Sequence, residues 1–138
     1  TYIEDMENYL QEIRDKIEQD SLSDGELEEI TIKLPVYIYF ANDKLEHLGV
    51  EGDVAGSMLS EAYDEKYLDA EGTIPEREAH SELSTIEEEL IEKAYKRAYK
   101  KLKSKLEKAE KCSILSSVFQ TVIYLEVHYD EQKRVYPY

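Results

Sequence analysis

Apolar side chains at the start of the chain recur every three or four residues, which is the spacing of one face of an α-helix. The pattern runs through residues 1–19 over two heptads, with acidic residues on the flanking positions. We expect this helix to pack on its own chain or on a second copy and to contribute to self-association. The repeated positions are Ile3, Met6, Leu10, Ile13 and Ile17.

Residues 24–48 carry a pattern that fits two structures. An apolar helical stripe continues to Leu48, yet residues 30–40 also alternate between apolar and polar positions, as a strand does. Pro35 disfavours both, because proline kinks a helix at a cost of about 3 kcal/mol and is confined to the edges of a sheet. We predict a kinked or broken helix that Gly49 ends, with the strand as the alternative.

Capping residues mark further helix starts. Ser23 with Glu26, and Thr73 with Glu76, have the spacing of a capping box, in which each residue accepts a hydrogen bond from the backbone of the other. A separate helix is predicted over residues 54–70. The turn at Thr73 then opens the next helical segment.

The second half of the chain predicts a long two-part helix over residues 75–117, broken near Ser84 and Thr85. Residues 119–129 are rich in β-branched and aromatic side chains, so they extend this helix or form a strand. Residues 132–138 read as a loose tail. The predicted fold is mainly α, with four or five helices in a single domain over residues 1–138. The alternative is an α+β fold with a short two-stranded sheet from 30–40 and 119–129.

Composition and charge change this picture in one respect. The chain has 138 residues, 41% apolar and 36% charged, which suits a folded helical domain and excludes a disordered or disulfide-rich one. Its net charge of −15 argues against nucleic acid as a partner. The charge is unevenly distributed, however. Residues 93–111 hold nine basic residues against two acidic ones.

On a helix, most of these basic side chains form one exposed stripe opposite the apolar face, with two tyrosines beside it. This layout is typical of a surface that follows a phosphate backbone and offers aromatic platforms to single-stranded bases. The alternative is charge pairing, either with glutamates one turn away or with the acidic N-terminal helix, and the two can compete. The candidate DNA-binding residues here are Lys93, Tyr95, Lys96, Arg97, Tyr99, Lys100, Lys101, Lys103 and Lys108.

Other site chemistry is sparse. His47, His80 and His128 lie in no metal-ligand spacing, and the chain has neither a phosphate-binding glycine loop nor a nucleophile motif. The single cysteine, Cys112, allows no intrachain disulfide, which suits a reducing cytoplasm. No apolar run approaches the roughly 20 residues of a membrane span. We therefore expect no catalytic residue, no cofactor, no metal and no membrane partner.

Short motifs occur in a fixed order between residues 34 and 118. They are Leu34-Pro35-x-Tyr37, Tyr63-x3-Tyr67-x2-Ala70-x-Gly72-Thr73, Glu76-Arg77-Glu78-Ala79-His80 and Ala94-Tyr95-Lys96-Arg97-x-Tyr99-x2-Leu102-Lys103. In this order the chain resembles small all-helical bacteriophage DNA-metabolism proteins similar to the myovirus recombination mediator.

The resemblance implies a non-enzymatic protein in the host-cell cytoplasm. Proteins of this kind bind single-stranded DNA, assemble into ring-like homo-oligomers and help to load a RecA-like recombinase against a single-strand-binding protein. By the same resemblance the DNA contacts would be Arg77, Lys96, Arg97, Lys100 and Lys103.

Two other functions fit the same charges. A small acidic inhibitor of phage type could mimic nucleic acid and block a host defence nuclease or polymerase, because most of the chain outside residues 93–111 is strongly acidic. A scaffolding module could instead pair its lysine stripe with the acidic helix of the next subunit.

Overall fold

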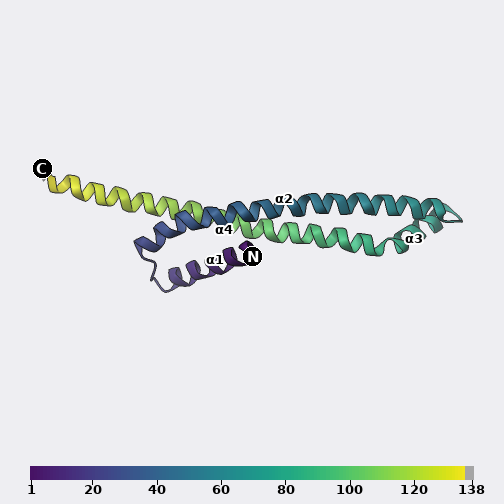
Figure 1. Ribbon diagram of the computed structural model, residues 1–138, viewed down its shortest axis with the longest axis horizontal. Coiled ribbons are helices and arrows are strands. Elements are labelled where there is room, and N and C mark those ends of the chain that lie inside the picture. Colours follow the sequence, from purple (N-terminus) through teal and green to yellow (C-terminus); the bar gives the residue numbers. More distant parts are fainter. Residues whose placement is uncertain (136–138) are drawn as a thin grey trace. The chain divides into compact units, whose positions relative to one another are not determined.

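The computed structural model describes residues 1–135, which form four helices joined by short turns (Figure 1). This part of the chain contains no strand. The predicted mainly α fold is therefore confirmed, and the alternative sheet between residues 30–40 and 119–129 is wrong. The helices are α1 (Tyr2–Glu18), α2 (Asp24–Asp69), α3 (Ile74–Ser84) and α4 (Ile86–Val135).

The helices divide into two compact units. The first unit holds residues 1–42 together with the chain from residue 104 onward, and the second holds residues 43–103. Because α2 and α4 each contribute to both units, the single domain predicted over residues 1–138 stays a prediction.

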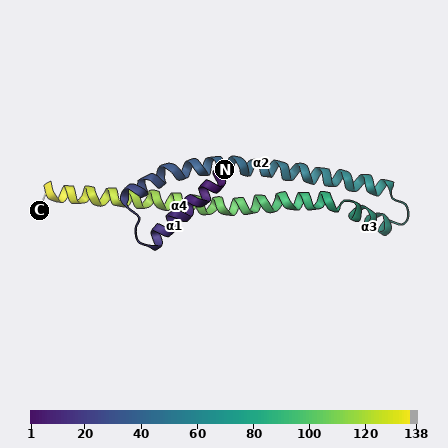
Figure 2. The ribbon, with the colours of Figure 1, turned by 60° about the horizontal axis from the view of Figure 1, so that its bottom comes forward.

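In the first unit, α1 folds back alongside the beginning of α2 (Figure 2). An ion pair between Lys16 and Glu26 joins α1 to α2, and the ring of Tyr2 stacks on that of Phe40 with centroids 4.2 Å apart. Large aliphatic side chains from α1, the first part of α2 and α4 fill the space between these helices. The buried apolar residues of this unit are Met6, Ile13, Leu27, Ile30, Leu34, Ala41, Leu106 and Ala109.

The capping box predicted at Thr73 and Glu76 is complete, whereas the one predicted at Ser23 and Glu26 is present only in its hydroxyl half. The Ser23 hydroxyl accepts a hydrogen bond from the Glu26 amide at 3.2 Å. The hydroxyl of Thr73 accepts one from the Glu76 amide at 3.4 Å, and the Glu76 carboxylate accepts the Thr73 amide at 3.3 Å. These contacts satisfy amides that would otherwise lack partners at the start of a helix.

The break predicted within residues 24–70 is wrong, because α2 continues from Asp24 to Asp69. Pro35 is exposed, so the backbone carbonyl that it leaves unpaired can bind water. Gly49 lies in the helix interior. A glycine there costs about 1 kcal/mol relative to alanine, which packing against a neighbouring helix can offset. The separate helix predicted over residues 54–70 is the second half of α2.

The helix predicted to end near residue 117 continues to Val135. No glycine or proline lies between Ile86 and Val135, and adding a residue to a formed helix costs far less than starting one. The predicted break is confirmed, since α3 ends at Ser84. Within the tail predicted over residues 132–138, the helix extends to Val135, and residues 136–138 lie outside the described residues.

Candidate nucleic-acid interface

Two glycines of α2 let the tyrosines of α4 approach its backbone in the second unit. A Cβ atom added to Gly49 would lie 3.5 Å from Cε2 of Tyr99, and one added to Gly52 would lie 3.6 Å from Cβ of Tyr95. Both are ordinary van der Waals distances. Tyr95 and Tyr99 therefore lie directly against α2, with room at these positions for a methyl group in van der Waals contact but for little more.

This close approach leaves a groove of about 410 Å³ beside the tyrosines. Its volume is within the range of small-ligand sites, which runs from roughly 300 to 1,000 Å³. One wall comes from α2 and the other from α4. The lining residues are Leu48, Gly49, Gly52, Asp53, Tyr95, Lys96, Tyr99, Lys100 and Lys103.

Three lysines project along the α4 side of this groove. Lys96, Lys100 and Lys103 are spaced four and three residues apart, so they lie on one helix face about 6 Å and about 4.5 Å apart along the axis. All three are exposed, whereas Tyr95 and Tyr99 are half-buried. The groove thus combines a line of exposed positive charges with two half-buried aromatic side chains.

We call residues 93–111 the basic segment. Only some of its basic side chains form ion pairs. Lys93 pairs with Glu89 at 2.8 Å, and Lys96 pairs with Glu92, as expected for residues one turn apart. Lys105 reaches Glu7 of α1 in the first unit, so the acidic N-terminal helix engages one lysine of the segment. Among residues 1–135, ion pairs are absent at Arg97, Lys100, Lys101, Lys103, Lys108 and Lys111.

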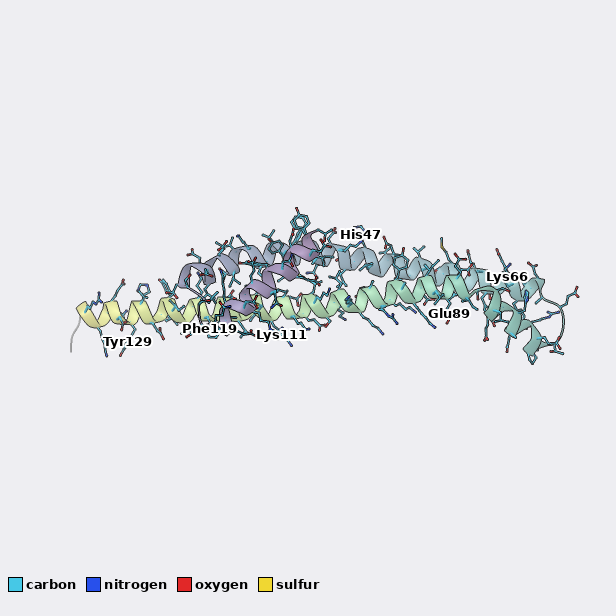
Figure 3. The ribbon with its side chains drawn as sticks, turned by 90° about the horizontal axis from the view of Figure 1, so that it is seen from below. His47, Lys66, Glu89, Lys111, Phe119 and Tyr129 are labelled. Carbon is cyan, nitrogen blue, oxygen red and sulfur yellow. The ribbon has the colours of Figure 1, made fainter. Side chains whose placement is uncertain are left out.

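The structure brings together five of the predicted DNA-binding residues in the groove: Tyr95, Lys96, Tyr99, Lys100 and Lys103. Lys93, Arg97 and Lys101 are exposed on α4 but do not line it. Lys108 belongs to the first unit. Figure 3 shows this stretch of α4 between the labelled Glu89 and Lys111.

Arg77 lies elsewhere in the second unit. Its guanidinium sits 6.0 Å from the ring centroid of Tyr67, which is a cation–π contact between α3 and α2. The buried Nε of Arg77 has no hydrogen-bond partner in the described part of the chain. Arg77 therefore packs inside this unit and does not reach the groove.

The α2 wall of the groove was missed by sequence reasoning. Gly49 was interpreted as a helix end, whereas Gly49, Gly52 and Gly56 recur at three and four residues and share one helix face. A Cβ added to Gly56 would lie 3.6 Å from Cδ of Glu92, so all three glycines face α4. A helical glycine stripe was the signal that could have found this contact.

The α1 residues predicted for self-association lie in the first unit. Met6 and Ile13 are buried there, Ile3 and Leu10 are half-buried, and Ile17 is 59% exposed. Self-association through this helix stays a prediction, with Ile17 as its exposed large side chain.

The remaining reactive groups have packing roles. Cys112 is half-buried, and burial raises the pKa of its thiol despite an opposing hydrogen bond with Ser116.

In residues 1–135, no three histidine, cysteine or carboxylate side chains are grouped as a metal site would require. In the same residues, no helix is both long enough and apolar enough to span a bilayer.

No protein-family model, curated protein or solved structure matches the chain.

Proposed function

We propose that the protein is a non-enzymatic accessory factor of phage DNA recombination that binds single-stranded DNA in the groove of the second unit and self-associates. The observation that carries this proposal is the grouping of Lys96, Lys100 and Lys103 with Tyr95 and Tyr99 along one groove. The protein would act in the cytoplasm of the host cell.

The chemistry of single strands matches this groove. Lysine ammonium groups neutralise phosphates without reading sequence, and aromatic side chains stack on bases at roughly 1–3 kcal/mol per base. A single strand can present phosphates to the lysines while a base turns toward Tyr95 or Tyr99. The negative charge of the rest of the chain repels DNA, so it confines binding to the basic segment.

The salt dependence of binding would measure how much of the basic segment takes part. Each phosphate neutralised on a single strand contributes about −0.7 to the slope of log K against log salt. Contact through the three groove lysines gives a slope of about −2. Neutralisation of about seven phosphates, which matches the net charge of residues 93–111 (nine basic residues less two acidic ones), gives a slope of about −5.

A RecA-like recombinase or a single-strand-binding protein is the proposed protein partner. This part of the proposal follows from the resemblance in motif order between residues 34 and 118. The acidic surface outside the basic segment is the part of this chain available to such a partner once DNA occupies the groove.

Fluorescence anisotropy with a labelled single-stranded oligonucleotide tests the proposal. Lys100→Glu/Lys103→Glu is expected to weaken binding by roughly tenfold or more at low salt, since it reverses two groove charges. Lys44→Glu/Lys66→Glu changes the net charge equally at exposed positions outside the basic segment and is expected to bind as the wild type does. Equal loss in both variants, or no salt-sensitive binding by the wild type, would rule out the groove as a DNA site.

The second candidate is the acidic inhibitor that mimics nucleic acid. It is favoured by the exposed carboxylates of Glu78, Glu82 and Glu87, which have no ion-pair partner among residues 1–135. Salt-sensitive binding to a basic protein, with none to DNA, would support this function instead.

A further inference from the structure

Over residues 114–129, one face of α4 is left exposed by the described part of the chain. Six large side chains fall within an arc of about 100° at the helical angle of 100° per residue. We call these residues the α4 seam. They are, with their exposed fractions, Ile114 (64%), Leu115 (56%), Val118 (52%), Val122 (45%), Leu125 (59%) and Tyr129 (59%).

The opposite face of the same helix is already in use. Ser116 is 6% exposed, and with Ile123 it faces a groove that α1 and α2 line with Ile13 and Leu27. Leu115 lies at the border between the two faces, because it also reaches this groove. The seam is therefore not the side on which the first unit packs its own helices.

The spacing of the seam specifies a helical partner. From Leu115 to Tyr129 its members follow at three, four, three and four residues, which is the heptad repeat of a coiled coil. A seam with this period buries its side chains best against another helix with the same period. The segment itself is such a helix.

Charge favours a second copy of this chain as that helix. The chain carries a net charge of −15, so two copies repel each other over most of their surface. Within residues 114–129, Glu126 is the one acidic residue and there is no lysine or arginine. Identical copies can therefore approach each other here with little repulsion.

The exposed area is also sufficient. The six seam residues, which are 45–64% exposed, offer on the order of 700 Å² of accessible surface. Each partner in a stable protein complex buries about this area. A seam that meets its own copy is self-complementary, so it closes into a dimer.

We propose that two copies of this chain associate through the α4 seam. The inference names the surface for the self-association in the proposed function, in place of the α1 face expected from sequence. Pairing of the seams removes six apolar side chains per copy from water and leaves the packing of the first unit unchanged.

Sedimentation equilibrium of the full chain tests this assignment without any DNA, so its outcome is independent of whether the groove binds DNA. The wild type is expected to sediment as twice the 16.1 kDa chain mass. Val118→Glu/Leu125→Glu is expected to halve the observed mass, because it places charges at two seam positions. Both side chains are more than half exposed, so the variant should keep the helix content of the wild type by circular dichroism.

Two variants serve as controls. Ile32→Glu/Val36→Glu changes apolar side chains of α2 that are 64% and 51% exposed, and it should remain dimeric. Ile17→Glu changes the exposed position on α1, and this variant should also remain dimeric. A monomeric wild type, a seam variant that keeps the wild-type mass, or equal dissociation of the seam and α2 variants would overturn the proposal.

Discussion

The two units of this protein bury different kinds of side chain. The first unit is filled by large aliphatic residues from three segments, with Met6 and Leu34 fully enclosed. In the second unit the buried apolar residues are Ala55, Ala70 and Leu102, and glycines face tyrosines. Burial of apolar area is the main source of stability, so the first unit gains more from packing. The second unit instead has a basic groove between α2 and α4.

The largest expected effect on the free energy of unfolding comes from removing a buried side chain of the first unit. Leu34→Ala in the first unit is expected to lower the free energy of unfolding by about 2–5 kcal/mol, because it leaves a cavity at a fully buried position. Leu83→Ala in the second unit removes a side chain that is 71% exposed and should change it by less than about 0.5 kcal/mol. Urea denaturation measures both values, and equal losses would show that the two units do not differ in this way.

Filling the glycine wall is expected to have the next largest effect, with the opposite sign. Gly49→Ala/Gly52→Ala should raise the free energy of unfolding by up to about 2 kcal/mol, since alanine is favoured over glycine by about 1 kcal/mol at each helical position. The new methyl groups would meet Tyr99 and Tyr95 at van der Waals distance without overlap. The measurement is again urea denaturation.

Gly72→Ala is the contrasting control for that variant. Gly72 has a φ of 112°, and a Cβ there would overlap Oε2 of Glu76. This substitution should destabilise the protein, because the backbone conformation favours glycine. If the helical double variant were also destabilised, close packing of α2 on α4 would require glycine itself.

The smallest expected effect concerns the ion pair that joins α1 to α2. The hydrogen-bonded ammonium of Lys16 lowers the pKa of Glu26, and the carboxylate raises the pKa of Lys16 in return. The pair should therefore stabilise the first unit fully between the ordinary glutamate pKa of about 4.3 and the ordinary lysine pKa of about 10.4. This contribution is lost as pH falls through the pKa of folded Glu26, or rises through that of folded Lys16.

Glu26→Gln tests that window. The stability difference between wild type and variant, followed by thermal unfolding across pH, should be largest near neutral pH and shrink in acid. A difference that stays constant from neutral to acidic pH would show that the Glu26 carboxylate does not provide this stabilisation.

Local sequence signals predicted much of the fold. The caps at Ser23 and Thr73 and the break at Ser84 depend on contacts within a few residues, and the structure contains all three. The continuity of α2 through Gly49 depends on what that helix packs against, which local propensity does not describe. Residues 119–129 are helical because they extend a long helix, although their own side chains favour strands.

For the same reason, only the α4 half of the candidate site could be predicted from the sequence. The α4 residues of the groove share one element, so helical periodicity places Lys96, Lys100 and Lys103 on a common face. The α2 wall is contributed by residues more than forty positions away, and its members include glycines that carry no side-chain chemistry.

The half-buried thiol of Cys112 can report on the packing of the first unit. Because this is the single cysteine of the chain, any thiol reagent labels one position only. The raised pKa and the partial cover by α1 and α2 slow that labelling, so it speeds up when these helices move away from α4. The labelling rate of the unmodified protein therefore reports movement of α1 and α2 away from α4.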